Sequence, residues 1–152
     1  MKNNMLYIAL IVVVNYGFTI VPLVPTPWGE MFPPMSLLVG FVFVARDFAQ
    51  REAGHLVLLS MLAGGVLSWF MAGPYVAVAS VVAFAISETI DWVVYTLSKK
   101  PLSQRIVLSS LASTPIDSTV FLAMIGHLSF AGVLAMTIAK IIGALIVARA
   151  VK

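Results

Sequence analysis

Ionisable and aromatic side chains recur within a long apolar stretch of this sequence, in a pattern that suits ligand recognition. Glu88, Asp91, Trp92 and Tyr95 lie at offsets of 0, 3, 4 and 7, so on a helix they share one face. A carboxylate can accept two parallel hydrogen bonds while an aromatic ring stacks on a flat partner. This face would therefore fit a planar heteroaromatic ring that carries adjacent N–H donors.

A second polar stripe repeats this geometry in the next apolar segment. Ser113, Thr114 and Asp117 have the spacing of a single helical face. Lys140 stands in the middle of the last apolar segment, and we expect its partner to be Asp117 or Glu88. A lysine in that position would hold the neighbouring carboxylates in their ionised form.

Two smaller polar groups complete the candidate site. Arg46, Asp47 and Gln50 occupy neighbouring positions of one helical face near the end of the second apolar segment, and we interpret them as a gate. For Arg46 there is an alternative, because long cationic side chains near helix ends can extend to the membrane surface. Asn15 adds a milder polar group in the first segment.

The composition identifies the environment of these residues as a lipid bilayer. Of the 152 residues, 61% are hydrophobic and 10% are charged, whereas roughly 25% are charged in a soluble domain. A membrane-spanning helix needs about 20 mostly apolar residues. The sequence predicts an all-α integral membrane protein, with residues 1–152 in one bundle of six transmembrane helices. We place the spans at residues 5–24, 35–51, 55–72, 75–97, 105–126 and 129–148.

Basic residues are confined to one set of connections between these spans. The odd-numbered connections contain neither lysine nor arginine, whereas the even-numbered ones and the two termini contain several. Because basic residues remain on the cytoplasmic side of a membrane, the pattern predicts cytoplasmic N- and C-termini. The residues on that side are Lys2, Arg51, Lys99, Lys100, Arg105, Arg149 and Lys152.

Small residues recur at intervals of four in two of the predicted spans. Helices in lipid associate through close backbone approach, for which small side chains leave room. The pattern predicts close helix contacts, either within a tight bundle or in a homodimer. The residues are Ser60, Gly64, Ser68 and Ala72 in the third span, and Ala131, Ala135, Ala139 and Gly143 in the sixth.

Charged residues inside the predicted spans need compensation. Each costs about 2.5–3.5 kcal/mol at a helix centre on insertion scales, so these side chains should face the bundle interior and pair with one another. The alternative to a ligand site is that such pairs only fix the packing of the helices. The charged residues are Arg46, Asp47, Glu88, Asp91, Asp117 and Lys140.

Several kinds of chemistry find no support in the sequence. It contains no cysteine, and therefore no thiolate nucleophile or thiolate metal site. Glu52 and His55 have a spacing used by metal sites, but the other predicted helices offer no matching ligands, so we expect neither a metal nor a cofactor. The chain has no basic patch with interleaved aromatics, which argues against a nucleic-acid partner. It has no Walker A sequence either, so any active accumulation would draw on an ion gradient or a partner.

Three short segments follow one another along the predicted spans: FVARDF at residues 43–48, SETIDWVVY at residues 87–95, and STPIDS at residues 113–118. In order and spacing they resemble the VUT family, the queuosine precursor transporters. This resemblance implies a multi-pass importer of 7-deazaguanine bases in the inner membrane of bacteria, or one encoded by their phages. It also implies that the substrate base is bound by Glu88, Asp91 and Asp117.

Other functions compatible with the sequence belong to different classes. The chain could be the substrate-binding membrane subunit of an energy-coupling-factor type transporter, or it could carry another purine-like or vitamin-like small molecule. A purely structural membrane subunit is a further alternative. An enzyme is not expected, because Asp91 and Asp117 lack the glycine-rich surroundings of intramembrane aspartyl proteases. Proton-coupled transport and facilitated diffusion both remain open.

Overall fold

The computed structural model describes residues 2–71 and 73–151, and these residues are almost entirely helical. The prediction of an all-α protein is therefore confirmed, apart from one short β-hairpin. The elements are α1 (Lys2–Ile20), β1 (Val24–Pro25), β2 (Met31–Phe32), α2 (Ser36–Ala53), the 3₁₀ turn η1 (Gly54–Leu56), α3 (Val57–Met71), α4 (Pro74–Ser98), α5 (Leu102–Met124) and α6 (Phe130–Ala150).

Proline and serine mark where several helices begin. Pro74 occupies the first turn of α4, and Pro101 directly precedes α5; proline suits these positions because its missing N–H would have no partner there. Ser129 caps α6, since its hydroxyl accepts a hydrogen bond of 2.9 Å from the backbone N–H of Gly132. These local signals explain why the predicted boundaries lie within a few residues of the observed ones.

The first predicted span is too long at its C-terminal end, because α1 ends at Ile20 and a β-hairpin follows. In the hairpin, Val24 pairs with Phe32 in antiparallel register. The backbone N–H of Thr26 donates to the carbonyl oxygen of Glu30 at 2.7 Å and closes the turn. Gly29 has a φ of +86°, a conformation that other residues rarely adopt. The sequence predicted no strand between the first two spans.

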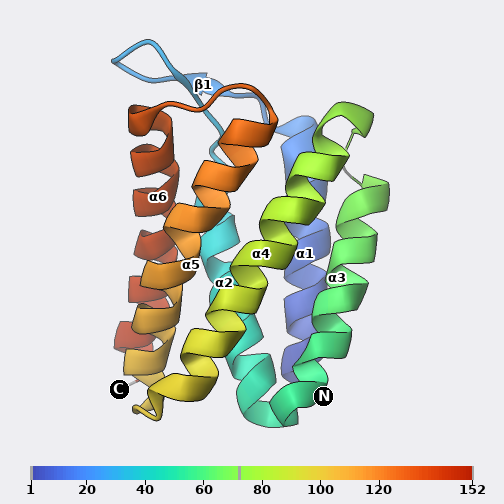
Figure 1. The fold of residues 1–152 in the computed structure, drawn as a ribbon, viewed down its shortest axis with the longest axis vertical. Helices are drawn as coiled ribbons and strands as arrows, with labels where there is room; N and C mark the ends of the chain where they lie inside the picture. Colours follow the sequence, from blue (N-terminus) through green and yellow to red (C-terminus); the bar gives the residue numbers. More distant parts are fainter. Residues whose placement is uncertain (1, 72, 152) are drawn as a thin grey trace.

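Five stretches are long and apolar enough to cross a membrane, judged by length and composition. One of them, Ser36–Met71, contains α2, η1 and α3 together. Figure 1 shows that α2 and α3 run in opposite directions, so this stretch folds back on itself at η1. The reversal occurs at Gly54, which has a φ of +59°. Both chain ends lie at the same end of the bundle in Figure 1, and the hairpin lies at the other.

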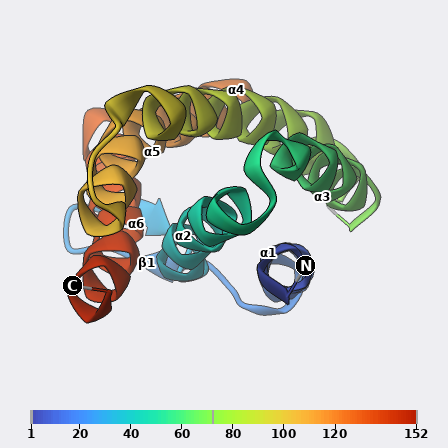
Figure 2. The ribbon, with the colours of Figure 1, turned by 90° about the horizontal axis from the view of Figure 1, so that it is seen from below.

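The helices form a closed ring in the order α1, α3, α4, α5, α6, α2. In the view along the bundle, α3, α4 and α5 make an arc, and α2 lies between α1 and α6 on the inner side of it (Figure 2). As a result α2 also contacts α3, α4 and α5. This central position explains why one continuous run of α2, residues 42–47, is buried on all sides.

Close contact between helix backbones brings α2 against α6. A Cβ atom added to Gly40 would lie 2.1 Å from the carbonyl oxygen of Lys140, and one added to Gly143 would lie 3.2 Å from the carbonyl oxygen of Leu37. At Gly64 of α3 the backbone instead meets the side chain of Ile11 of α1. The predicted small-residue stripes therefore do form helix contacts within the chain.

The two stripes are not buried along their full length. Ser60, Gly64 and Ser68 are buried in α3, and Ala139 and Gly143 are buried in α6. Ala131 and Ala135 are only partly covered. Ala72 lies outside the described residues, as does Lys152 among the basic residues.

The close approach at Gly40 predicts a specific loss of stability. Gly40→Ala would force α2 away from the backbone of α6, and overpacking of this kind typically costs about 1–3 kcal/mol. We expect a lower temperature of thermal unfolding in detergent for this variant. Gly65→Ala is the matched control, because its Cβ would meet nothing closer than the Phe84 ring at 4.0 Å. Equal unfolding temperatures for the two variants would contradict the packing.

Candidate functional site

A cavity of about 750 Å³ opens at the hairpin end of the bundle. Its walls come from α1, α4, α5 and α6 and from the hairpin itself, and they are mainly apolar. Gly29, His127 and Leu128 line its mouth and are exposed, so the cavity can be reached from solution at this end.

A smaller cavity of about 90 Å³ continues from it towards the middle of the bundle. Four side chains line both cavities and show that the two adjoin: Asn15, Phe18, Ser80 and Phe121. Asp117 and Lys140 lie at the inner end of the smaller cavity. A path therefore leads from the hairpin end to an ion pair inside the bundle.

Asp117 joins three helices at this inner end. Lys140 of α6 donates a hydrogen bond of 2.5 Å to its Oδ2 atom, and Ser87 of α4 donates one of 2.9 Å to Oδ1. Lys140 also donates to the Ser118 hydroxyl at 2.9 Å. The predicted pairing of Lys140 with Asp117 is thus confirmed. The side chain of Asp117 is 13% exposed, whereas that of Lys140 is 1% exposed.

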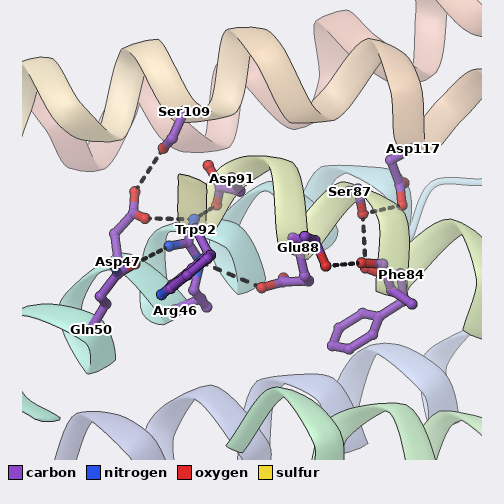
Figure 3. Close-up of polar contacts among 12 residues, drawn as sticks. Arg46, Asp47, Gln50, Phe84, Ser87, Glu88, Asp91, Trp92, Ser109 and Asp117 are labelled. Atoms are coloured by element: carbon purple, nitrogen blue, oxygen red, sulfur yellow. Dashed lines mark hydrogen bonds and ion pairs between the residues drawn. The ribbon is translucent and has the colours of Figure 1, made fainter. Parts of the chain in front are cut away.

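Arg46 is the centre of a second, fully buried cluster (Figure 3). Its Nη2 atom lies 2.9 Å from Asp47 and also contacts Asp91, and its Nε atom lies 3.4 Å from Glu88. Ser109 of α5 donates a hydrogen bond of 3.2 Å to Asp47. The cluster therefore ties α2 to α4 and α5.

This arrangement decides between the alternatives that the sequence left open for Arg46 and Lys140. Arg46 does not extend to the membrane surface, because its side chain is 0% exposed. Glu88 and Asp91 pair with Arg46 rather than with Lys140. The physical reason is the position of α2 on the inner side of the arc of α3, α4 and α5, which brings its polar face to α4 and α5.

Further polar contacts continue from this cluster towards the chain termini. Arg46 donates a hydrogen bond of 2.5 Å to Gln50, which in turn donates one of 2.7 Å to Thr96. The Tyr95 ring lies beneath two guanidinium groups, 5.7 Å from Arg46 and 5.1 Å from Arg105. Because these groups fill the bundle interior and line neither cavity, the path from the hairpin end stops above them.

The two aromatic residues predicted to stack on a ligand lie away from both cavities. Trp92 makes an edge contact with His55, their ring centroids 5.6 Å apart, and packs against the apolar core beside α1 and α2. Tyr95 belongs to the Arg46 cluster. The aromatic residues that line the cavities are instead Phe18, Phe84 and Phe121.

The remaining predicted residues differ in their access to the cavities. Asn15 lines both of them and donates hydrogen bonds to the Ile11 carbonyl at 2.8 Å and to the Ser68 hydroxyl at 3.1 Å. Ser113 and Thr114 line neither cavity and are 0% exposed, and their hydroxyls have no hydrogen-bond partner among the described residues.

The predicted site did not include the residues of α4 that share the face of Glu88 and Asp91 nearer the hairpin end. Ser80 lines both cavities, Phe84 lines the inner one, and Ser87 binds Asp117. Their spacing relative to Asp91 was the available signal, because offsets of 4, 7 and 11 residues keep them on one helical face.

A bundle of apolar helices with a solvent-reachable cavity that ends at a buried ion pair defines a multi-pass membrane protein with a small-molecule path. The family model described as "Putative vitamin uptake transporter" matches residues 5–151, and the chain belongs to this family. The family indicates transport rather than catalysis. No curated protein and no solved structure matches the chain.

Because Asp117 and Lys140 form an ion pair, we predict that the loss of stability on replacing one depends strongly on whether the other is present. Lys140→Met leaves the Asp117 carboxylate buried without its cation, which typically costs about 3–5 kcal/mol. The double variant with Asp117→Asn should regain most of the lost stability, because no unpaired charge remains. Thermal unfolding of the wild type, both single variants and the double variant in detergent measures this cycle. Additive losses would show that the pair is not coupled.

Proposed function

We propose that this protein imports queuosine precursors, the 7-deazaguanine bases, across the membrane. Membership of the vitamin uptake transporter family and the resemblance of three segments to queuosine precursor transporters support this substrate. The observation that carries the proposal is Asp117, a carboxylate at the inner end of a cavity that Phe84 and Phe121 also line.

Asp117 has the acceptor capacity that the base requires. A deazaguanine presents a ring N–H and an exocyclic amine side by side. Each carboxylate oxygen has two acceptor positions, and Ser87 and Lys140 occupy one on each oxygen. One position therefore remains on each oxygen for the two donors of the base. Asp117 forms an ion pair with Lys140, and hydrogen bonds to a charged acceptor are stronger than those to a neutral one.

Other residues of the inner cavity suit the remainder of the base. Phe84 and Phe121 offer ring faces for stacking. Asn15 and Ser80 supply polar groups on the opposite walls, from α1 and α4. In this proposal Glu88 and Asp91, which form ion pairs with Arg46, do not bind the base. They close the path at the end of the bundle where both chain termini lie.

The proposed topology has six spans with both termini in the cytoplasm, so that the cavity faces the outside. The reversal at η1 and the common position of both termini in Figure 1 support an even number of spans. Arg51 and Lys99 lie at the terminal end, as the distribution of basic residues requires.

This topology can be tested by cysteine labelling, because the chain contains no cysteine. In spheroplasts we expect an impermeant maleimide to label Trp28→Cys and His127→Cys without prior permeabilisation. Lys2→Cys and Arg149→Cys should react only after the membrane is opened. If Ser36–Met71 crossed only once, the two terminal variants would differ from each other, and the six-span topology would be wrong.

The substrate and the role of Asp117 are tested together by uptake. Cells that cannot make 7-deazaguanine bases and that express this protein should accumulate the labelled bases, and excess guanine should compete poorly. Asp117→Asn should lower the initial rate roughly 10- to 100-fold, because a hydrogen bond to a charged group contributes about 1.5–3 kcal/mol. The change alters neither size nor shape, and membrane content is measured in parallel.

Thr119→Ala is the control, since its hydroxyl bonds only to the Pro115 carbonyl on the exposed side of α5. Unchanged uptake in Asp117→Asn would exclude this site, and no uptake by the wild type would exclude the substrate. Vesicles that contain only the purified chain should transport the base. Binding without transport would instead assign the chain as a substrate-binding subunit that needs an energising partner.

A further inference from the structure

The buried cluster around Arg46 contains more carboxyl groups than cations. Asp47, Glu88 and Asp91 all contact the one guanidinium group, and all four side chains are 0–1% exposed. If every carboxyl group were ionised, the cluster would carry a net charge of −2, from one positive and three negative groups. A membrane interior offers no water to compensate such an excess.

The nearest other cations already have partners. Lys140 donates to Asp117 and Ser118 and makes no ion pair with this cluster. Arg105 lies against the Tyr95 ring, and its Nε atom donates to the Lys100 carbonyl. The guanidinium group stands between the carboxyl groups, where it would repel a metal ion. A proton is therefore the cation best able to neutralise the cluster.

We propose that Glu88 binds a proton in this state and that the protein is a proton symporter, which carries one proton inward with each substrate molecule. The proposal rests on the import function proposed above and adds its energy source. The proton enters from the cavity, is held as an O–H group on Glu88, and leaves to cytoplasmic water.

Glu88 is the carboxyl group of the cluster with the longest contact to Arg46. Asp47 receives a charged contact of 2.9 Å from Arg46 and a hydrogen bond from Ser109. Asp91 contacts the same Nη2 atom. The Glu88 carboxyl group lies 3.4 Å from Nε of Arg46, and it also faces the Tyr7 hydroxyl.

The groups around Glu88 can accommodate its protonated form. From α1, the buried Tyr7 hydroxyl faces Glu88. A protonated Glu88 could donate to this oxygen. From α3, Met61 and Gly65 line a mainly apolar groove of about 460 Å³, and Glu88 lines it as well. The remaining charged neighbours are Arg46 and Asp47 of α2, Asp91 of α4, and Asp117 of α5.

The position of Glu88 connects proton binding to the substrate path. Its neighbour in the chain, Ser87, donates to Asp117 at the inner end of the cavity. On the other side, Glu88 of α4 meets Arg46 of α2 across the closed part of the bundle. A neutral Glu88 can separate from Arg46 without leaving an unpaired carboxylate in the membrane. Protonation thus permits α4 and α2 to part, and the water that then enters from the cytoplasm takes up the proton.

Infrared spectroscopy tests the protonated carboxyl group without any substrate. The purified wild type at neutral pH should show the carbonyl stretch of a carboxylic acid, and this band should be lost in Glu88→Gln. Glu52→Gln, at the exposed end of α2, should retain it. Gln resembles a protonated Glu in shape and charge, so Glu88→Gln should unfold at a temperature no lower than the wild type. Absence of the band, or its persistence in Glu88→Gln, would overturn the proposal.

Transport in vesicles tests the coupling. With the membrane potential clamped at zero and an acidic exterior, vesicles of the wild type should accumulate the labelled deazaguanine roughly tenfold for each pH unit of gradient. Their lumen should acidify as the base enters. Glu88→Gln should exchange labelled for unlabelled base but should reach only the external concentration.

Transport by the wild type that does not acidify the lumen, or that needs sodium instead, would overturn the symport. If the wild type takes up no deazaguanine, the import function fails and the symport of this substrate fails with it. The infrared band would still decide separately whether Glu88 holds a proton.

Discussion

The burial of Arg46 constrains the rest of the structure. A guanidinium group inside a bilayer must be surrounded by acceptors from the protein, because lipid offers none. Asp47, Glu88 and Asp91 supply them, and two of these three belong to α4. To meet α4 in this way, α2 has to lie on the inner side of the arc of α3, α4 and α5. The close backbone contact at Gly40 and α6 makes that position sterically accessible.

The burial of Arg46 divides the bundle interior into two parts. Towards the hairpin, the interior is hollow and leads to Asp117, whose side chain keeps some exposure. Towards the termini, the interior is filled by Arg46 and its partners and by the contact between Gln50 and Thr96. In the proposed import cycle, the path is open at the hairpin end and closed at the other end. The cluster that holds the fold together therefore stands where the path would have to open.

Much of this architecture can be predicted from the sequence, but the pairing of the charges cannot. Proline and glycine mark the helix ends, and an offset of three or four residues places Glu88 and Asp91 on one face of α4. Which cation meets that face depends on the order of the helices around the ring, which arises from contacts between residues far apart in the chain, such as Gly40 and Lys140. The hairpin was missed for a different reason, since strands of two residues show no periodicity.

Lys140 and Arg46, the two cations described in the bundle interior, differ in how many acceptor groups they can bind. An ammonium group is a compact charge with three donors, and Lys140 serves one carboxylate and one hydroxyl. A guanidinium group has five donors in a plane and stays protonated in proteins, which allows Arg46 to face three carboxyl groups at once. Because the charge of Arg46 is fixed, the charge of its cluster can change only through the carboxyl groups. The carboxyl group with the longest contact to Arg46, that of Glu88, is where such a change costs least.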